Sequence, residues 1–168
     1  YSPVWPGSRY PNLILFQLIP KVALAPLFVV WLGIGMESRL AFALFISFFP
    51  IVISMATGLS EVDRSAIRMC RSLTATEWQQ FVNVRFPYAL PYLFSGMKVG
   101  MTMAMIGVIV GEFIASQAGL GYLIIFATSR AETAVIMAAI TVLCALGLTL
   151  YGAVLLAELA MKRWYYGR

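Results

Sequence analysis

Long apolar runs dominate the pattern of this chain and are separated by short polar segments. Four runs are long enough for membrane-crossing helices: residues 13–35, 40–59, 92–113 and 134–161. A helix rises 1.5 Å per residue, so about 20 apolar residues cover a hydrocarbon core of about 30 Å. The pattern therefore predicts an all-α integral membrane protein with four transmembrane helices.

A weaker apolar stretch separates the third and fourth runs. Residues 116–129 contain too few consecutive apolar residues to cross a membrane, so we expect a short re-entrant or interfacial helix there. Within the third run, small residues recur at intervals of four: Gly96, Gly100 and Ala104, then Gly107 and Gly111. In lipid this spacing lets two helix backbones approach closely, which predicts a close helix crossing.

The one long polar interval covers residues 60–91 and has the pattern of two short amphipathic helices with a break between them. Thr74 and Glu77 fit the capping-box pattern, in which Ser or Thr is followed one turn later by Glu or Gln. Thr76 and Gln79 fit the same pattern. These signals predict that the second short helix begins near Glu77.

Two prolines and an apolar stripe define the rest of this interval. The second helix is expected to run to about Val84, because Pro87 lacks a backbone donor and should stop it, whereas Pro91 is well placed to open the next helix. Trp78 and Phe81 lie at helical spacing and form a narrow apolar stripe. A helix this short is marginal in water, so it must dock either on a partner or on the chain's own transmembrane helices.

Composition supports the membrane class and excludes several activities. The chain is 61% hydrophobic and 11% charged, whereas soluble domains carry about a quarter charged residues. It contains no histidine, which excludes imidazole base and metal chemistry. It also lacks a phosphate-binding glycine loop and a metal-ligand cluster, so we expect no catalysis and no cofactor in this chain. Cys70 and Cys144 are expected to be free thiols.

Basic residues are distributed unevenly around the four runs. They gather in or beside the polar interval and at the end of the chain: Arg64, Arg68, Arg71, Arg85 and Lys98, then Lys162, Arg163 and Arg168. Only Arg39 and Arg130 flank the other side. The positive-inside rule therefore places the interval and the C-terminus in the cytoplasm. The net charge of +5 needs no nucleic acid to explain it, since no base-stacking or groove-reading motif is present.

Short sequence motifs in the polar interval resemble those of a known family. Arg71-Ser72-Leu73, Ala75-Thr76, Trp78-Gln79 and Ala89-Leu90-Pro91 resemble the signature loop of permease subunits of binding-protein-dependent ATP-binding-cassette importers, in the nitrate, sulfonate and taurine branch. That loop usually opens with Glu-Ala-Ala and contains a glycine, and here Arg68-Met69-Cys70 and Thr74 hold these positions. Threonine is a poor residue for a positive φ, so we expect the turn to be built differently here.

The resemblance implies a fold and a set of partners. It implies a MetI-like permease core of the type I importer fold, usually with six transmembrane helices, in the plasma membrane of a bacterium. Since only four runs are present, we expect this chain to be a fragment. The implied partners are an ATPase subunit, which would bind ATP and Mg²⁺, a second permease subunit, an extracytoplasmic solute-binding protein and membrane lipid.

The resemblance also implies which residues act in transport. The residues expected to form the contact with the ATPase are Arg71, Ser72, Leu73, Thr74, Ala75, Thr76, Glu77, Trp78 and Phe81. Leu90 and Pro91 are expected to connect the loop to the next helix. Residues that could line a solute passage are Pro26, Trp31, Phe49, Met105, Glu112 and Ser116. For Glu112 a hydrogen bond to the turn at residues 116–121 is equally compatible with the sequence.

Two other functions fit the same pattern. A structural subunit would keep this scaffold but lose coupling through the altered Arg68 and Thr74 positions. A proton- or sodium-driven carrier is a further alternative, but such carriers usually show two similar halves, and no internal repeat is found in this sequence.

Overall fold

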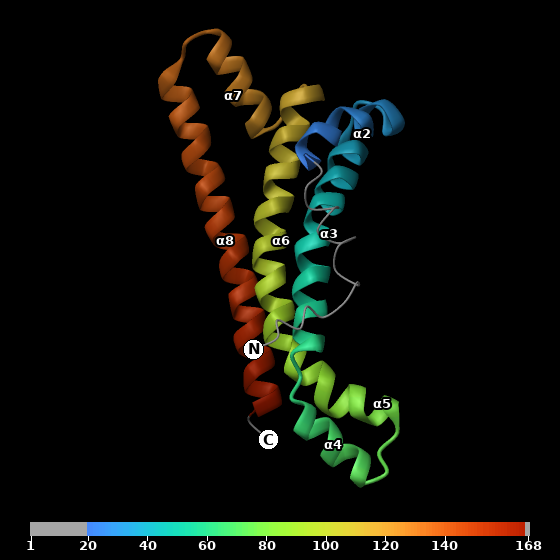
Figure 1. The fold of residues 1–168 in the computed structure, drawn as a ribbon. Helices are drawn as coiled ribbons and strands as arrows, with labels where there is room; N and C mark the ends of the chain where they lie inside the picture. The colour runs from blue at the N-terminus through green and yellow to red at the C-terminus, as the bar shows by residue number, and fades with distance from the viewer. Residues whose placement is uncertain (1–19, 167–168) are drawn as a thin grey trace, which may run out of the picture.

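The computed structural model describes residues 20–166, which form helices joined by short turns (Figure 1). In chain order these are a 3-10 turn (Lys21–Leu24), α2 (Ala25–Leu32), α3 (Met36–Ser60), α4 (Arg64–Ser72), α5 (Glu77–Gln80), a π-helical turn (Phe81–Arg85), α6 (Phe86–Ala115), α7 (Leu120–Ser129) and α8 (Thr133–Tyr166). No strand occurs among these residues, which confirms the all-α class.

Three of the described helices are long and apolar enough to cross a membrane: Met36–Ser60, the continuous helix Glu77–Ala115, and Thr133–Arg163. They cover three of the four expected spans. The expected span at residues 13–35 lies partly outside the described residues, and its described part is a shorter helical segment, Lys21–Leu32. A span there therefore stays a prediction.

Residues 36–39, which separate the first two apolar runs of the sequence, are helical. These residues make the first turn of α3. Ser38 Oγ and Arg39 Nε both donate to the carbonyl oxygen of Gly35, at 3.1 and 3.0 Å. Glu37 also lies in this first turn, where the helix dipole favours an acid. Polar side chains therefore stabilise the helix start instead of interrupting it.

The two prolines of the polar interval neither end nor begin a helix, contrary to the prediction. Pro87 does not stop the helix that starts at Glu77, because residues 81–85 form a π-helical turn that leads directly into α6. The Phe86 amide donates to the Phe81 carbonyl, one residue further back than in an α-helix. Such a wider turn is a recognised way for a helix to change its hydrogen-bond register. Pro91 lies inside α6 and does not open a helix.

The close crossing predicted from the small residues is confirmed between α3 and α6. A Cβ added at Gly96 would lie 2.7 Å from Ser54 Cβ, and one added at Gly107 would lie 2.9 Å from Ala43 Cα. Both distances are shorter than real carbon contacts. The two backbones therefore touch where α6 has no side chain, and we call this contact the glycine seam.

Charged side chains join α8 to α6 near the end that carries α4. Lys98 Nζ of α6 lies 2.5 Å from Glu158 Oε2, and Lys162 Nζ lies 2.7 Å from Glu158 Oε1. Glu158 is buried, although it lies beside an apolar run. Toward the other end α8 leans away from α6 and connects to it through α7 (Figure 1).

Gly107→Ala is expected to lower the stability of the protein by about 1–3 kcal/mol, because the added methyl group would overpack a backbone contact. Thermal unfolding in detergent micelles measures this loss. Gly152→Ala is the matched control, since nothing lies within 4 Å of a Cβ at that position. An unchanged unfolding temperature for Gly107→Ala would contradict the close approach.

Candidate functional site

The polar interval folds into two short helices, α4 and α5, which project from one end of the α3 and α6 pair (Figure 1). We call residues 64–81 the hairpin. It follows the end of α3 and continues through the π-helical turn into α6. A force applied to the hairpin therefore reaches α6 through unbroken helix.

The first helix of the hairpin has a side-chain cap. Asp63 accepts a hydrogen bond from the Ser65 amide at 2.8 Å and another from the Ser65 hydroxyl. These hydrogen bonds, with a smaller contribution from the positive charge of Arg68, hold the pKa of Asp63 below its ordinary value. The cap is therefore the ionised form and weakens only when acid protonates it.

Thr74 makes the turn between the two helices with a positive φ of 56°. Its amide donates to the Arg71 carbonyl at 3.0 Å, and the Ala75 amide donates to the Cys70 carbonyl at 3.0 Å. This pair of bonds is the Schellman arrangement that usually ends a helix at a glycine. The expectation that threonine forces a different turn is therefore wrong, because two backbone hydrogen bonds hold the left-handed residue in place.

The second helix begins with the capping box predicted at Thr76 and Gln79. The Thr76 amide donates to Gln79 Oε1 at 2.9 Å, and the Gln79 amide donates to Thr76 Oγ1 at 3.3 Å. The alternative pairing of Thr74 with Glu77 does not form among the described contacts. Glu77 instead lies 3.7 Å from Arg71 Nη2 across the turn, with both side chains largely exposed.

The aromatic stripe of the hairpin faces outward. Trp78 is 72% exposed, and its ring stacks on Phe81 with 5.9 Å between the centroids. Leu73, in the turn, is 70% exposed. Trp78 and Leu73 are therefore largely exposed on short capped helices, whereas Phe81 is half-buried and also contacts the ring of Phe86, with 6.2 Å between the centroids. The option that Trp78 packs back on the chain's own transmembrane helices is not what the structure shows.

Gln80 contributes to the hairpin and was not predicted from the sequence. It is buried, and its Nε2 donates to the Ala75 carbonyl at 2.9 Å. This bond closes the turn from inside and places the second helix. A single glutamine in a polar segment gives no sequence signal of burial, so the pattern could not have identified it.

The remaining loop residues lie at separate places. Ser72 Oγ donates to the Met69 carbonyl at 2.8 Å and closes the end of α4. Leu90 is buried and Pro91 lies next to it inside α6, where the hairpin's helix enters the bundle. They therefore belong to the root of the hairpin and not to its exposed surface.

The residues predicted to line a passage do not converge on one cavity. Met105 lines an apolar cavity of about 470 Å³ between α3, α6 and α8. Phe49 lines a different cavity and lies under Lys21, with 4.2 Å from Nζ to the ring centroid. Pro26 is in the first turn of α2, and Trp31 is 69% exposed. A passage role for these residues stays a prediction.

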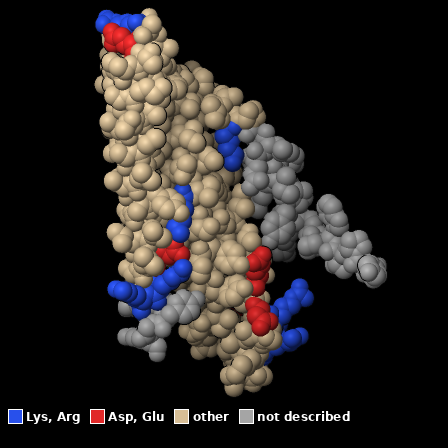
Figure 2. Space-filling view, turned by 90° about the vertical axis from the view of Figure 1, so that its left-hand side faces the viewer, with Lys and Arg blue, Asp and Glu red and all other residues tan. Residues whose placement is uncertain are grey.

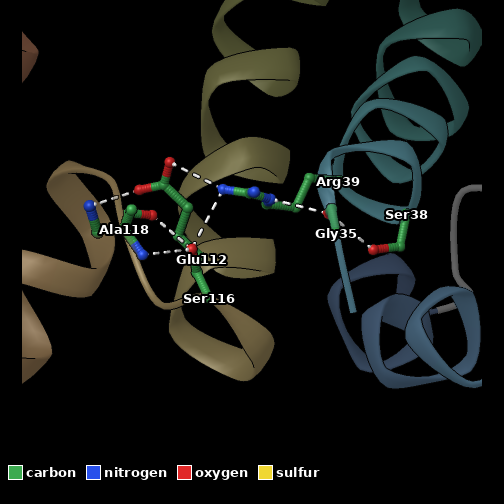
Figure 3. A network of polar contacts seen from close by, with 7 residues as sticks. Gly35, Ser38, Arg39, Glu112, Ser116 and Ala118 are labelled. Carbon is green, nitrogen blue, oxygen red and sulfur yellow. Dashed lines mark hydrogen bonds and ion pairs between the residues drawn. The ribbon is translucent and has the colours of Figure 1, made fainter. Parts of the chain in front are cut away.

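Glu112 and Ser116 lie at the opposite end of the bundle from the hairpin, in a polar network (Figure 3). Glu112 Oε2 accepts from the Gly121 amide at 2.6 Å, so the expected hydrogen bond to this turn is confirmed. Glu112 Oε1 also lies 3.6 Å from Arg39 Nη1, which donates to Ser116 Oγ at 3.2 Å. Arg39 was identified in the sequence only as a charge flanking the membrane.

No group of three or more Cys, Asp or Glu side chains that could hold a metal ion is found within residues 20–166. Cys70 and Cys144 are free. The hairpin presents an exposed tryptophan ring, capped helix ends and a continuous helix behind them.

Long apolar helices with an exposed hairpin at one end define a multi-pass membrane protein. The chain belongs to the family of binding-protein-dependent transport system inner membrane components, whose family model matches residues 10–162. This result confirms the resemblance seen in the polar interval.

Curated relatives have names of the same class. The riboflavin transport system permease protein RibX of Chloroflexus aurantiacus is 39% identical over 154 residues, which are 92% of this chain and 58% of the relative. The formylaminopyrimidine transport permease protein ThiX of Halalkalibacterium halodurans is 32% identical, over 92% of this chain and 62% of the relative. The taurine transport system permease protein TauC of Escherichia coli is 32% identical, over 84% and 52%. The chain thus spans somewhat more than half the length of these relatives.

Thr74→Gly is expected to stabilise the turn of the hairpin by about 1 kcal/mol, because a residue with a Cβ pays a steric cost in the left-handed region that glycine avoids. Hydrogen exchange at the Thr74 and Ala75 amides measures this, and we expect exchange to slow about fivefold. Thr74→Ala is the control, since alanine keeps the Cβ and should not slow exchange. Faster exchange in the glycine variant would show that the threonine side chain stabilises the turn.

Proposed function

We propose that this chain is a permease subunit of an ATP-driven importer and that the hairpin docks on a separate ATPase subunit. The single observation that carries the proposal is the exposed Trp78, stacked on the half-buried Phe81, on a capped helix continuous with α6. Names of the relatives as permeases support the transport class. In this proposal ATP and Mg²⁺ are bound by the partner and not by this chain.

Coupling would follow from the mechanics of the hairpin. Trp78 and Phe81 would insert into an apolar cleft of the ATPase, while Arg71 and Glu77 at the rim would add charge complementarity. Closure of two ATPase subunits around ATP would bring two such hairpins together. Because the hairpin is continuous with α6, this movement would tilt the membrane helices and switch the solute passage from inward-open to outward-open.

The distribution of charge supports the orientation. Figure 2 shows most of the charged side chains on this face toward the end that carries α4, with fewer at the opposite tip and a largely uncharged surface between the two ends. Five basic residues of the polar segment and α6, and Lys162 and Arg163 of α8, belong to this end by sequence. We therefore infer that the hairpin and the C-terminus face the cytoplasm of a bacterial cell.

The other partners follow from the surface of the bundle. Leu44, Phe48 and Leu148 are among the apolar side chains that remain at least 60% exposed along the long helices. Lipid and a second permease subunit, most simply a second copy, would cover them. The names of the relatives include riboflavin, formylaminopyrimidine and taurine, which range from heteroaromatic compounds to an aminosulfonate. The proposal therefore extends to a small solute delivered by an extracytoplasmic binding protein and no further.

Trp78→Ala is expected to abolish uptake and to weaken ATPase binding by about 2 kcal/mol or more, the effect of losing a central interface residue. Glu77→Arg is also expected to abolish uptake and to loosen the ATPase, because it reverses a charge at the rim of the contact. Copurification with a tagged chain and ATP-dependent uptake into vesicles measure the two effects. Ile34→Ala is the control, because Ile34 is equally exposed, at 74%, but lies in the turn between α2 and α3, at the end opposite the hairpin. Normal uptake in both hairpin variants would refute the proposal.

The same experiments separate the alternatives. A structural subunit would copurify with the complex, but uptake would not depend on the hairpin. An ion-driven carrier would transport without an ATPase and would not respond to vanadate. The turn at Thr74 has the geometry that a glycine would give, so the altered position does not by itself favour a subunit that has lost coupling.

A further inference from the structure

Glu112 lies near the end of α6 and contacts two other helices through one carboxylate. Oε2 accepts from the Gly121 amide at 2.6 Å, and Oε1 lies 3.6 Å from Arg39 Nη1 of α3 (Figure 3). The Glu112 side chain is 12% exposed and that of Arg39 is 20% exposed. A carboxylate with so little access to water depends on these partners for its stability.

For α7 this contact serves as an N-terminal cap that comes from another helix. Residue Gly119 precedes the first turn and has no side chain to cap it. The amide of Gly121, in that first turn, would otherwise lack an acceptor, because the first amides of a helix have no partner within it. Glu112 supplies a negatively charged acceptor at the positive end of the helix dipole.

The two glycines of this turn leave the space that the carboxylate occupies. A Cβ added at Gly119 would lie 2.2 Å from Glu112 Oε1, and φ at Gly119 is 121°. A Cβ added at Gly121 would lie 2.9 Å from Glu112 Cβ. The backbone of the turn therefore closes directly over the side chain, which indicates a contact built into the fold.

Arg39 connects the same carboxylate to the start of α3. Its Nε donates to the Gly35 carbonyl at 3.0 Å and its Nη1 to Ser116 Oγ at 3.2 Å, so the guanidinium is held from both sides. The start of α3, the end of α6 and the start of α7 thus meet at one acid. This junction lies at the end of the bundle opposite the hairpin (Figure 1).

We propose that Glu112 is a positioning residue for transport: by capping α7 it makes α7 and the attached α8 follow α3 and α6 when the hairpin moves. This inference rests on the proposed function. If the cap is lost, the hairpin and the ATPase still engage, but α7 no longer follows α6. ATP hydrolysis then continues while solute uptake falls, so the ratio of ATP hydrolysed to solute transported rises.

The test uses the full-length permease in its complex, reconstituted in vesicles with ATP, its ATPase and its binding protein. For Glu112→Ala we expect about a tenfold rise in ATP hydrolysed per solute transported, since the cap and the charge are both lost. Glu112→Gln keeps an acceptor oxygen for the Gly121 amide and should give a smaller rise, about threefold. Glu132→Gln, an exposed acid in the turn before α8, is the matched control and should leave the ratio unchanged.

A charge-reversal pair separates the cap from the ion pair. Arg39→Glu combined with Glu112→Arg restores opposite charges, but an arginine cannot accept from the Gly121 amide, so we expect no recovery of the ratio. Full recovery in the double variant, or a normal ratio in Glu112→Ala, would overturn the inference. Failure of the parent chain to bind an ATPase would refute the proposed function instead, and the two failures are therefore distinguishable.

Discussion

The contact of α3 with α6 along the glycine seam is the constraint on which the rest of the structure depends. In a bilayer, helices gain little from burying apolar side chains, because lipid is equally apolar, so close packing must hold them together. At Gly96 and Gly107 the backbone of α6 approaches Ser54 and Ala43 with no room for a Cβ. The two helices are thereby held in one register, and this register determines what meets at each end. One end presents the hairpin and the other brings Arg39 to Glu112.

The hairpin is stabilised differently, because its short polar helices lie outside the bundle. Helices this short are unstable alone. Here each helix start is capped by a side chain, at Asp63 and at Thr76, and Gln80 closes the turn from within. The left-handed Thr74 costs free energy that its two backbone hydrogen bonds offset. These contacts stabilise the hairpin and leave Trp78 exposed. A docking surface requires such an ordered and accessible side chain.

Local patterns predicted the parts of this structure that depend on local physics. The four-residue spacing of Gly96 and Gly100 indicated the seam, and the Thr76 and Gln79 capping box indicated the start of α5. The prediction that Pro87 ends the helix was wrong, because residues 81–85 form a π-helical turn that connects α5 to α6. The hydrogen bonds of this turn reach back one residue further than in an α-helix, which the sequence pattern does not reveal. The ion pair of Arg39 with Glu112 could not be predicted from the sequence, because the two residues lie on helices far apart in the chain. Only the packing of α3 against α6 brings them together.

The two ends of the bundle are mechanically linked by the way α3 and α6 touch. Helices in backbone contact along most of their length cannot slide past each other without collision at the seam, so they tilt as one body. α8 differs, since near the hairpin it is held to α6 by the pairing of Lys98 with Glu158 and toward the other end it leans away. Charged contacts tolerate small rotations better than interlocked backbones do. Rotation of α8 about this ion pair is therefore limited at the far end by α7, whose start is held by the Glu112 carboxylate.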